Sequence, residues 1–148
     1  MTLIELVVAI VIISISLTGT LLLVDTTTRR SADPLLDRQA ISIGQAYLEE
    51  ILQKAYTDPD DGALCPPAEA ARSLYDNICD YAGLNELGAR NQSGAVVVGL
   101  EGFRIEINVD TSASLAGLTG PGEVLRVDAT VTDPTLRVFQ FSGYRTSL

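Results

Sequence analysis

The chain of 148 residues contains no histidine and no tryptophan. Histidine is the commonest general base near neutral pH and a frequent metal ligand, so its absence lowers the expectation of an enzyme. The sequence also lacks a Ser/His/Asp or Cys/His combination and a glycine-rich phosphate loop. We therefore expect a protein that is not an enzyme and that needs no cofactor.

Positive charge is scarce as well. The chain has 10 lysines and arginines against 19 aspartates and glutamates, a formal net charge of -9 at pH 7. The basic residues are scattered singly apart from Arg29 and Arg30, whereas proteins that bind the phosphate backbone cluster them on one surface. No nucleic-acid partner is expected.

The chain has only two cysteines, Cys65 and Cys79. Two thiols are too few for a thiolate zinc site, and their spacing is not that of a C-x-x-C redox motif. The pair fits one structural disulfide in an oxidising compartment, where closing a loop of about 15 residues contributes roughly 3 kcal/mol. Two free thiols are the alternative.

Charge is almost missing from residues 1–24, MTLIELVVAIVIISISLTGTLLLV, where Glu5 is the one charged side chain. The apolar run after Glu5 is close to the ~20 residues that span a bilayer as a helix, and no basic region precedes it as in a signal peptide. A carboxylate at mid-bilayer costs roughly 2.5–3.5 kcal/mol on insertion scales. We expect Glu5 either to pair with a cation, such as the Met1 amine, or to lie at the membrane interface.

Residues 25–56 predict a second, amphipathic half of the same helix. Asp33-Pro34 predicts a kink or a break, because proline removes a helical hydrogen bond. A helix over residues 2–56 would be roughly 80 Å long, so we expect its apolar half to project from the folded domain. The expected buried stripe has helical spacing and consists of Leu36, Ala40, Ile43, Tyr47, Ile51 and Ala55.

The remaining chain predicts a head of mixed structure. Residues 57–94 contain a turn at 57–63, a short helix at 68–78 between the cysteines, and a loop at 84–93. Residues 95–148 alternate apolar and polar side chains as half-buried antiparallel strands do. The fold class is therefore α+β, with the amphipathic half-helix packed on the sheet. The expected strands cover residues 95–99, 102–110, 123–132 and 136–145.

The N-terminal residues Met1, Thr2, Leu3, Ile4 and Glu5 carry a family resemblance. They are similar to the processed N-terminus of type IV pilins and of the related pseudopilins. The resemblance implies that prepilin peptidase removes a basic leader and that the new terminal amine, at Met1, is N-methylated. Met1 stands where phenylalanine is commonest in the family. Residues 31–52, 73–84 and 142–148 further resemble minor pilins of mannose-sensitive haemagglutinin systems.

The resemblance also implies a fold, a place and partners. The fold is the type IV pilin fold, with a single pass through the bacterial inner membrane and a head in the periplasm. Assembly machinery then draws the chain into an extracellular pilus or a periplasmic pseudopilus of identical or homologous subunits. In this role Glu5 pairs with the Met1 amine of an adjacent subunit. The alternatives are a type II secretion pseudopilin and a membrane-anchored binding protein that never polymerises.

The resemblance places a weak point in the apolar helix. Many family members carry a proline where the apolar half ends, and there the helix unwinds in filaments. This chain has Thr18, Gly19 and Thr20 instead, and glycine costs about 1 kcal/mol against alanine in a helix interior. We expect any unwinding in an assembled filament to fall within residues 18–25.

Acidic residues gather in the turn that follows the helix, at Asp58, Asp60 and Asp61, and again at Asp76 and Asp80. These carboxylates are calcium candidates, because calcium prefers oxygen ligands. The full calcium-loop pattern is lacking, however, and solvated turn charges explain them more simply. The sequence therefore predicts no metal site, with the three residues of the turn as the alternative.

Overall fold

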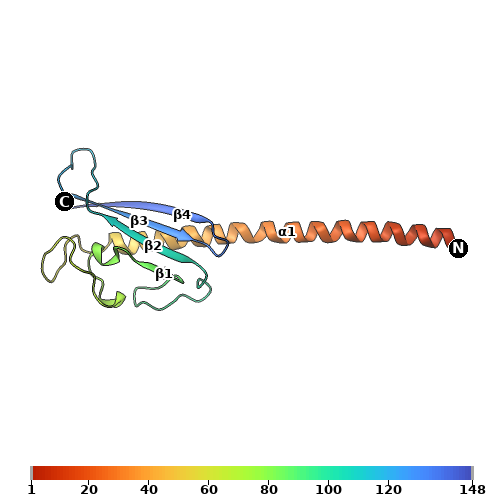
Figure 1. Ribbon diagram of the computed structural model, residues 1–148, viewed down its shortest axis with the longest axis horizontal. Helices are drawn as coiled ribbons and strands as arrows, with labels where there is room; N and C mark the ends of the chain where they lie inside the picture. Colours follow the sequence, from red (N-terminus) through yellow and green to blue (C-terminus); the bar gives the residue numbers. More distant parts are fainter. Residues whose placement is uncertain (1, 148) are drawn as a thin grey trace. The chain divides into compact units, whose positions relative to one another are not determined.

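The computed structural model describes the backbone of residues 2–147 and the side chains of all of these except residues 23 and 25–33. The fold is α+β, with an apolar N-terminal helix and a C-terminal antiparallel sheet, as the sequence predicts (Figure 1). Within the described range the elements are α1 (Leu3–Leu52), the 3-10 turns η1 (Arg72–Leu74) and η2 (Ile78–Tyr81), β1 (Asn85–Leu87), β2 (Arg104–Asp110), β3 (Val124–Thr132) and β4 (Val138–Thr146).

The chain divides into two compact units, Met1–Asp37 and Arg38–Leu148. The boundary falls inside α1, so the last part of this helix belongs to the second unit together with the sheet. The two units are described separately below.

Helix α1 runs without interruption through Pro34, so of the expected kink or break the break is wrong and the kink stays a prediction. A proline removes one backbone donor, and the turns on either side keep their hydrogen bonds. The helix ends at Leu52 and not near residue 56. It ends there because Ala55 pairs elsewhere: its N–H donates to the Asp76 carbonyl at 3.0 Å, and its carbonyl accepts from the Ile78 N–H at 3.1 Å.

The four strands form an antiparallel meander in the order β1-β2-β3-β4. The alternation predicted for the second and third strand segments is confirmed, because every second side chain of β2 and β3 is buried or half-buried. The last strand segment is confirmed as β4, and Ala129 of β3 pairs with both Ile107 of β2 and Phe141 of β4. The core of the sheet lies along this row.

Two expectations for the head are wrong. Residues 95–99 form no strand: Val96 makes only an isolated bridge with Arg90, and Val98 is 91% exposed. Residues 84–93 were expected to be a loop but contain β1, which extends the edge of the sheet beside β2. A run of valines is too short a pattern to distinguish a strand from an exposed turn.

The helix expected at residues 68–78 is also wrong. The segment contains η1 and is then followed by η2, and both Ala71 and Asn77 have extended backbone angles. Asn77 acts as the cap of η2, where its side chain accepts from the Cys79 N–H and Asp80 bonds back to the Asn77 N–H. This capping box and the bridge to Ala55 compete with a regular helix.

The last part of α1 packs on the sheet, as the strands beside it in Figure 1 show. The buried stripe is confirmed at Ala40, Ile43, Tyr47 and Ile51. Helix α1 and the sheet can approach each other closely because each contributes a glycine at the contact.

Gly44 of α1 and Gly143 of β4 interlock the helix with the sheet. A Cβ at Gly44 would overlap the ring of Phe141, and a Cβ at Gly143 would lie 2.7 Å from Leu52 Cδ1. Each glycine thus leaves room for a large side chain from the opposite element. The fit is tight enough that neither position has space for a methyl group.

A tight turn at Asp133 and Pro134 joins β3 to β4. The buried Asp133 carboxylate accepts from the Thr135 N–H at 2.8 Å and the Arg137 N–H at 3.0 Å. Burial raises the Asp133 pKa, but these hydrogen bonds and the Arg137 guanidinium lower it more, and the net pKa falls. The turn holds Leu136 at a φ of 67° with 82% of its surface exposed.

We predict that Gly44→Ala lowers the stability of the head. Overpacking costs about 1–3 kcal/mol, more than the about 1 kcal/mol that alanine gains over glycine inside a helix. Gly19→Ala is the matched control, since no atom lies within 4 Å of its added Cβ. Thermal unfolding of the full chain in detergent should show a midpoint below that of the wild type for Gly44→Ala and an unchanged midpoint for Gly19→Ala. Equal midpoints for the two variants would contradict the packing.

Leu136→Gly should be tolerated although it removes a side chain. A non-glycine residue in the left-handed region costs of order 1–3 kcal/mol, which offsets the roughly 0.5–1 kcal/mol that glycine loses through unfolded-chain entropy. Val98→Gly relieves no left-handed strain. It should therefore lower the free energy of unfolding by the full entropic cost of roughly 0.5–1 kcal/mol. Chemical denaturation should find Leu136→Gly the more stable variant; the reverse order would show that Leu136 is not strained.

Candidate functional site

The candidate functional site is the apolar surface of α1 in the first unit. Residues Leu3–Leu22 are long and apolar enough to cross a membrane, with a mean hydropathy of 2.3. Each large apolar side chain described in this range is at least 49% exposed. A continuous apolar surface of this size is unstable in water and requires lipid or other apolar helices around it.

The hydroxyl groups within this surface are satisfied by their own helix. Ser14 Oγ donates to the Ile10 carbonyl at 2.8 Å, and Ser16 Oγ donates to the Ile12 carbonyl at 2.9 Å. Thr18 and Thr20 do the same one turn later, with the carbonyls of Ser14 and Ser16. The helix therefore presents no unpaired hydroxyl of these four to an apolar environment.

Glu5 belongs to a capping box at the start of α1. Its Oε2 accepts from the Thr2 N–H at 3.4 Å, and its own N–H donates to Thr2 Oγ1 at 3.4 Å. Both distances are at the long end of the hydrogen-bond range. The sequence signal was available, because Thr2-Leu3-Ile4-Glu5 fits the S/T-x-x-E capping pattern. Glu5 thus has a local role that reasoning from charge alone missed.

The remaining expectations for this unit have different outcomes. Met1 lies outside the described residues, so its pairing with Glu5 stays a prediction. Thr18, Gly19 and Thr20 are helical in the single chain, and unwinding in a filament stays a prediction too. Small residues at this point form a shallow notch on the helix, lined by Ser14, Ile15, Thr18 and Gly19.

In the second unit, Arg72 connects the segment after α1 to both the helix and the sheet. Its Nη1 donates to Glu86 Oε1 at 2.6 Å, and its Nη2 lies 3.3 Å from Glu50 Oε1. Its guanidinium also stacks over the rings of Tyr47 and Tyr81, at 4.7 and 5.6 Å from their centroids. The Arg72 side chain is 6% exposed and those of both glutamates 11%.

The two tyrosines complete this buried cluster. Tyr47 Oη donates to Glu86, and Tyr81 Oη donates to Glu50 Oε1 at 2.6 Å. Burial and the hydrogen bond to Glu86 raise the pKa of Tyr47 to about 12. Burial and the Glu50 carboxylate raise the pKa of Tyr81 as well. Both phenols therefore stay protonated donors, and the cluster fixes the head and has no reactive group poised for catalysis.

The cysteine and aspartate expectations fall in the same segment. Cys65 and Cys79 form the predicted disulfide. The three calcium candidates do not form one group: Asp58 Oδ1 accepts from the N–H groups of Asp60 and Asp61, at 2.7 and 3.3 Å. Asp58 instead lies with Glu69 and Asp76, and one oxygen of each is within 4.8 Å of the others.

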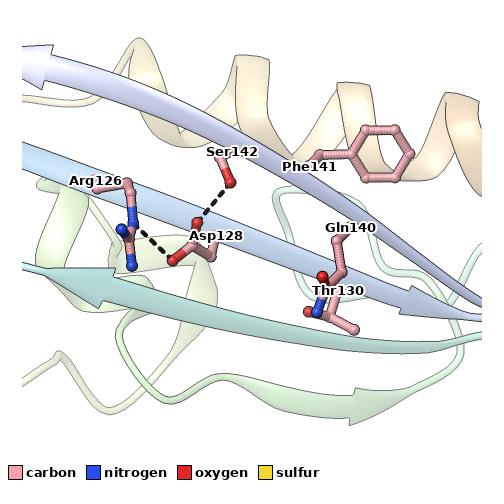
Figure 2. Close-up of a pocket in the computed structure, with 6 residues that line it drawn as sticks. All are labelled: Arg126, Asp128, Thr130, Gln140, Phe141 and Ser142. Atoms are coloured by element: carbon pink, nitrogen blue, oxygen red, sulfur yellow. Dashed lines mark hydrogen bonds and ion pairs between the residues drawn. The ribbon is translucent and has the colours of Figure 1, made fainter.

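The outer face of the sheet is polar. Arg126 Nε donates to Asp128 Oδ2 at 3.0 Å, and Ser142 Oγ donates to Asp128 Oδ1 at 2.6 Å (Figure 2). Asp128 raises the pKa of the Arg126 guanidinium, so this pair stays charged and mutually neutralised. The face can exchange hydrogen bonds with a partner but carries little net charge here. The recess on it is lined by Arg126, Asp128, Thr130, Gln140, Phe141 and Ser142.

No protein-family model, curated protein or solved structure matches the chain.

Arg72→Met should destabilise the head strongly. Methionine keeps apolar contact with the two tyrosine rings but leaves the buried Glu50 and Glu86 without their cation, which typically costs about 3–5 kcal/mol. The control is Arg104→Met, because Arg104 is exposed and donates to Asn85, and we expect it to change stability by less than about 0.5 kcal/mol. Similar losses for both variants in chemical unfolding would contradict the role of Arg72.

Proposed function

We propose that this chain is a structural subunit of a type IV pilus-like filament. The observation that carries the proposal is the exposed apolar surface of Leu3–Leu22, which contains the carboxylate Glu5 near its start. On this proposal the helix anchors the chain in the inner membrane before assembly. Afterwards the same surface packs against the helices of identical or homologous subunits in the filament core.

The energetics favour a transfer between these two environments. Apolar side chains gain their stabilisation by leaving water, at roughly 25 cal/mol per Å², and both lipid and a helix bundle provide this. Extraction from the membrane therefore costs little hydrophobic free energy. What then favours assembly is close packing between helices, which small residues such as Ser14, Thr18 and Gly19 assist.

Glu5 would direct the register of this packing. Its hydrogen bonds with Thr2 are long, so its carboxylate keeps capacity to accept a stronger, charge-assisted bond. We propose that the N-methylated amine of Met1 on an adjacent subunit supplies it, after prepilin peptidase has exposed that amine. In an apolar core an unpaired carboxylate is costly, so only subunits in the correct register are stable.

Two substitutions separate capping from charge pairing. Glu5→Gln keeps the capping pattern, since glutamine also serves at this position, but removes the charge. Thr2→Ala keeps the charge and removes the Thr2 hydroxyl that caps Glu5. We predict that Glu5→Gln abolishes filament formation, whereas Thr2→Ala still assembles. Electron microscopy of sheared surface filaments measures the outcome.

The control is the amount of each variant in the membrane fraction, which should equal that of the wild type. Normal filaments from Glu5→Gln would contradict the charge role. Loss of filaments with Thr2→Ala alone would show that the local cap is what matters. If the wild type itself stays in the membrane and never enters filaments, the chain is a membrane-anchored protein that does not polymerise.

A further inference from the structure

Strand β4 lies at one edge of the sheet, and half of its backbone groups point away from β3. The hydrogen bonds just beyond both ends of the β3–β4 ladder show which half. The Asp133 N–H donates to the Arg137 carbonyl at 3.0 Å, and the Ser147 N–H donates to the Glu123 carbonyl at 3.2 Å. Because bonded pairs alternate along an antiparallel ladder, every second residue between them faces outward. These residues are Val138, Gln140, Ser142, Tyr144 and Thr146.

The outward groups find no partner within the described part of the chain. β4 is the last strand in the sheet order, and the backbone hydrogen bonds outside the ladder involve none of the five residues. Val138 is 58% exposed and Tyr144 48%. The edge therefore presents five N–H donors and five C=O acceptors in alternation to its surroundings.

This edge also lacks the features that usually prevent strand addition. Natural sheets protect their edges with proline, lysine, a bulge or a very short strand. β4 is nine residues long, pairs one-to-one with β3 without a bulge, and contains neither proline nor lysine. The opposite edge strand, β1, has three residues. Beyond it, Ala89 is already bonded to Leu100 through its N–H and to Val97 through its carbonyl.

The two faces of β4 determine which side chains suit an added strand. Figure 2 shows Phe141 on one side of the strand and Gln140 with Thr130 on the other. The Phe141 ring lies against Gly44 of α1, and Phe139 on the same face is half-buried too. Apolar side chains of an added strand would cover these rings, whereas polar side chains would match the outer face.

We propose that β4 binds an extended segment of a partner protein, which adds to the sheet as a further strand. Backbone hydrogen bonds supply the affinity, and the alternating side chains supply the specificity. The segment carries apolar side chains toward α1 and polar side chains on the outer face. It has no proline at the positions that donate to β4.

A second copy of this chain fits the edge less well. The last part of α1 runs alongside β4, because Gly44 approaches Phe141 and Leu52 approaches Gly143. Two β4 strands paired antiparallel would place these helical segments in opposite directions. Chains anchored in one membrane present them in the same direction. This choice of occupant rests on the proposed membrane anchoring, whereas the open edge itself does not.

Strand β3 provides a probe with the required pattern. Its residues Leu125, Val127 and Ala129 are buried on the α1 side, and its alternate residues line the outer face with Gln140 and Ser142. The test therefore measures binding of a fluorescent peptide of the sequence Val124–Thr132 to the full chain in detergent, by fluorescence polarisation. We expect saturable binding by the wild type.

N-methylated peptides test which backbone groups bind. Methylation at the peptide's Arg126, Asp128 and Thr130 removes the N–H groups that face β4 when the polar side chains lie on the outer face. It should weaken binding by at least about tenfold, because three hydrogen bonds are lost. The matched control carries the methyl groups at Leu125, Val127 and Ala129, whose N–H groups face solvent, and it should bind like the unmodified peptide.

A substitution in the protein gives the same test from the other side. Gln140→Pro removes one outward N–H and leaves the hydrogen bonds to β3 in place, as proline does on an edge strand. It should weaken peptide binding, whereas Gln140→Val keeps the N–H and should bind as the wild type does. Circular dichroism reports whether each variant is folded. The methylated peptides decide the question even if Gln140→Pro fails to fold.

Three results would overturn the proposal. The first is a folded wild type that does not bind the unmodified peptide. The second is a greater loss for the peptide methylated at Leu125, Val127 and Ala129, which would show that the peptide replaces β3 within the sheet. The third is a wild type that sediments as a dimer which Gln140→Pro dissociates, since the occupant would then be a second copy. Filament assembly is tested separately by Glu5→Gln, so the two proposals can fail independently.

Discussion

The structure depends on a hydrophobic surface that its own chain does not cover. The first part of α1 exposes every large apolar side chain described between Leu3 and Leu22, although its hydroxyls and its first turn are satisfied locally. The described residues of the first unit form this helix alone, so nothing within that unit removes the surface from water. Stability of this unit is therefore a property of its surroundings, lipid or other helices, and not of the isolated molecule.

The second unit, in contrast, is stabilised by contacts that are buried within it. Gly44 and Gly143 let the helix and β4 approach until each receives a large side chain of the other. Arg72, in the segment between α1 and β1, forms ion pairs with Glu50 of the helix and Glu86 of β1. A head fixed in this way can be carried by the helix without its own fold changing, which suits a subunit that moves from a membrane into an assembly.

Regular patterns could be read from the sequence, and long-range contacts could not. The alternation in β2 and the stripe on α1 predicted their buried faces because these periods act over many residues. Pro34 was expected to kink or break the helix, and it does not break it, because one missing donor does not outweigh intact turns on both sides. The capping role of Glu5 was visible as a local motif. The meeting of Asp58, Glu69 and Asp76 was not, since it depends on how turns far apart in the chain fold together.

The central claim is that the apolar helix serves assembly and not only anchoring. Peptide mass spectrometry of filaments sheared from the cell surface tests it most directly, because it reports the presence of the chain and the chemistry of its terminal amine together. The account predicts peptides of this chain in the filaments, with an N-methylated Met1. A chain that is confined to the membrane fraction, with an unmethylated terminus and none of its peptides in the filaments, would contradict it.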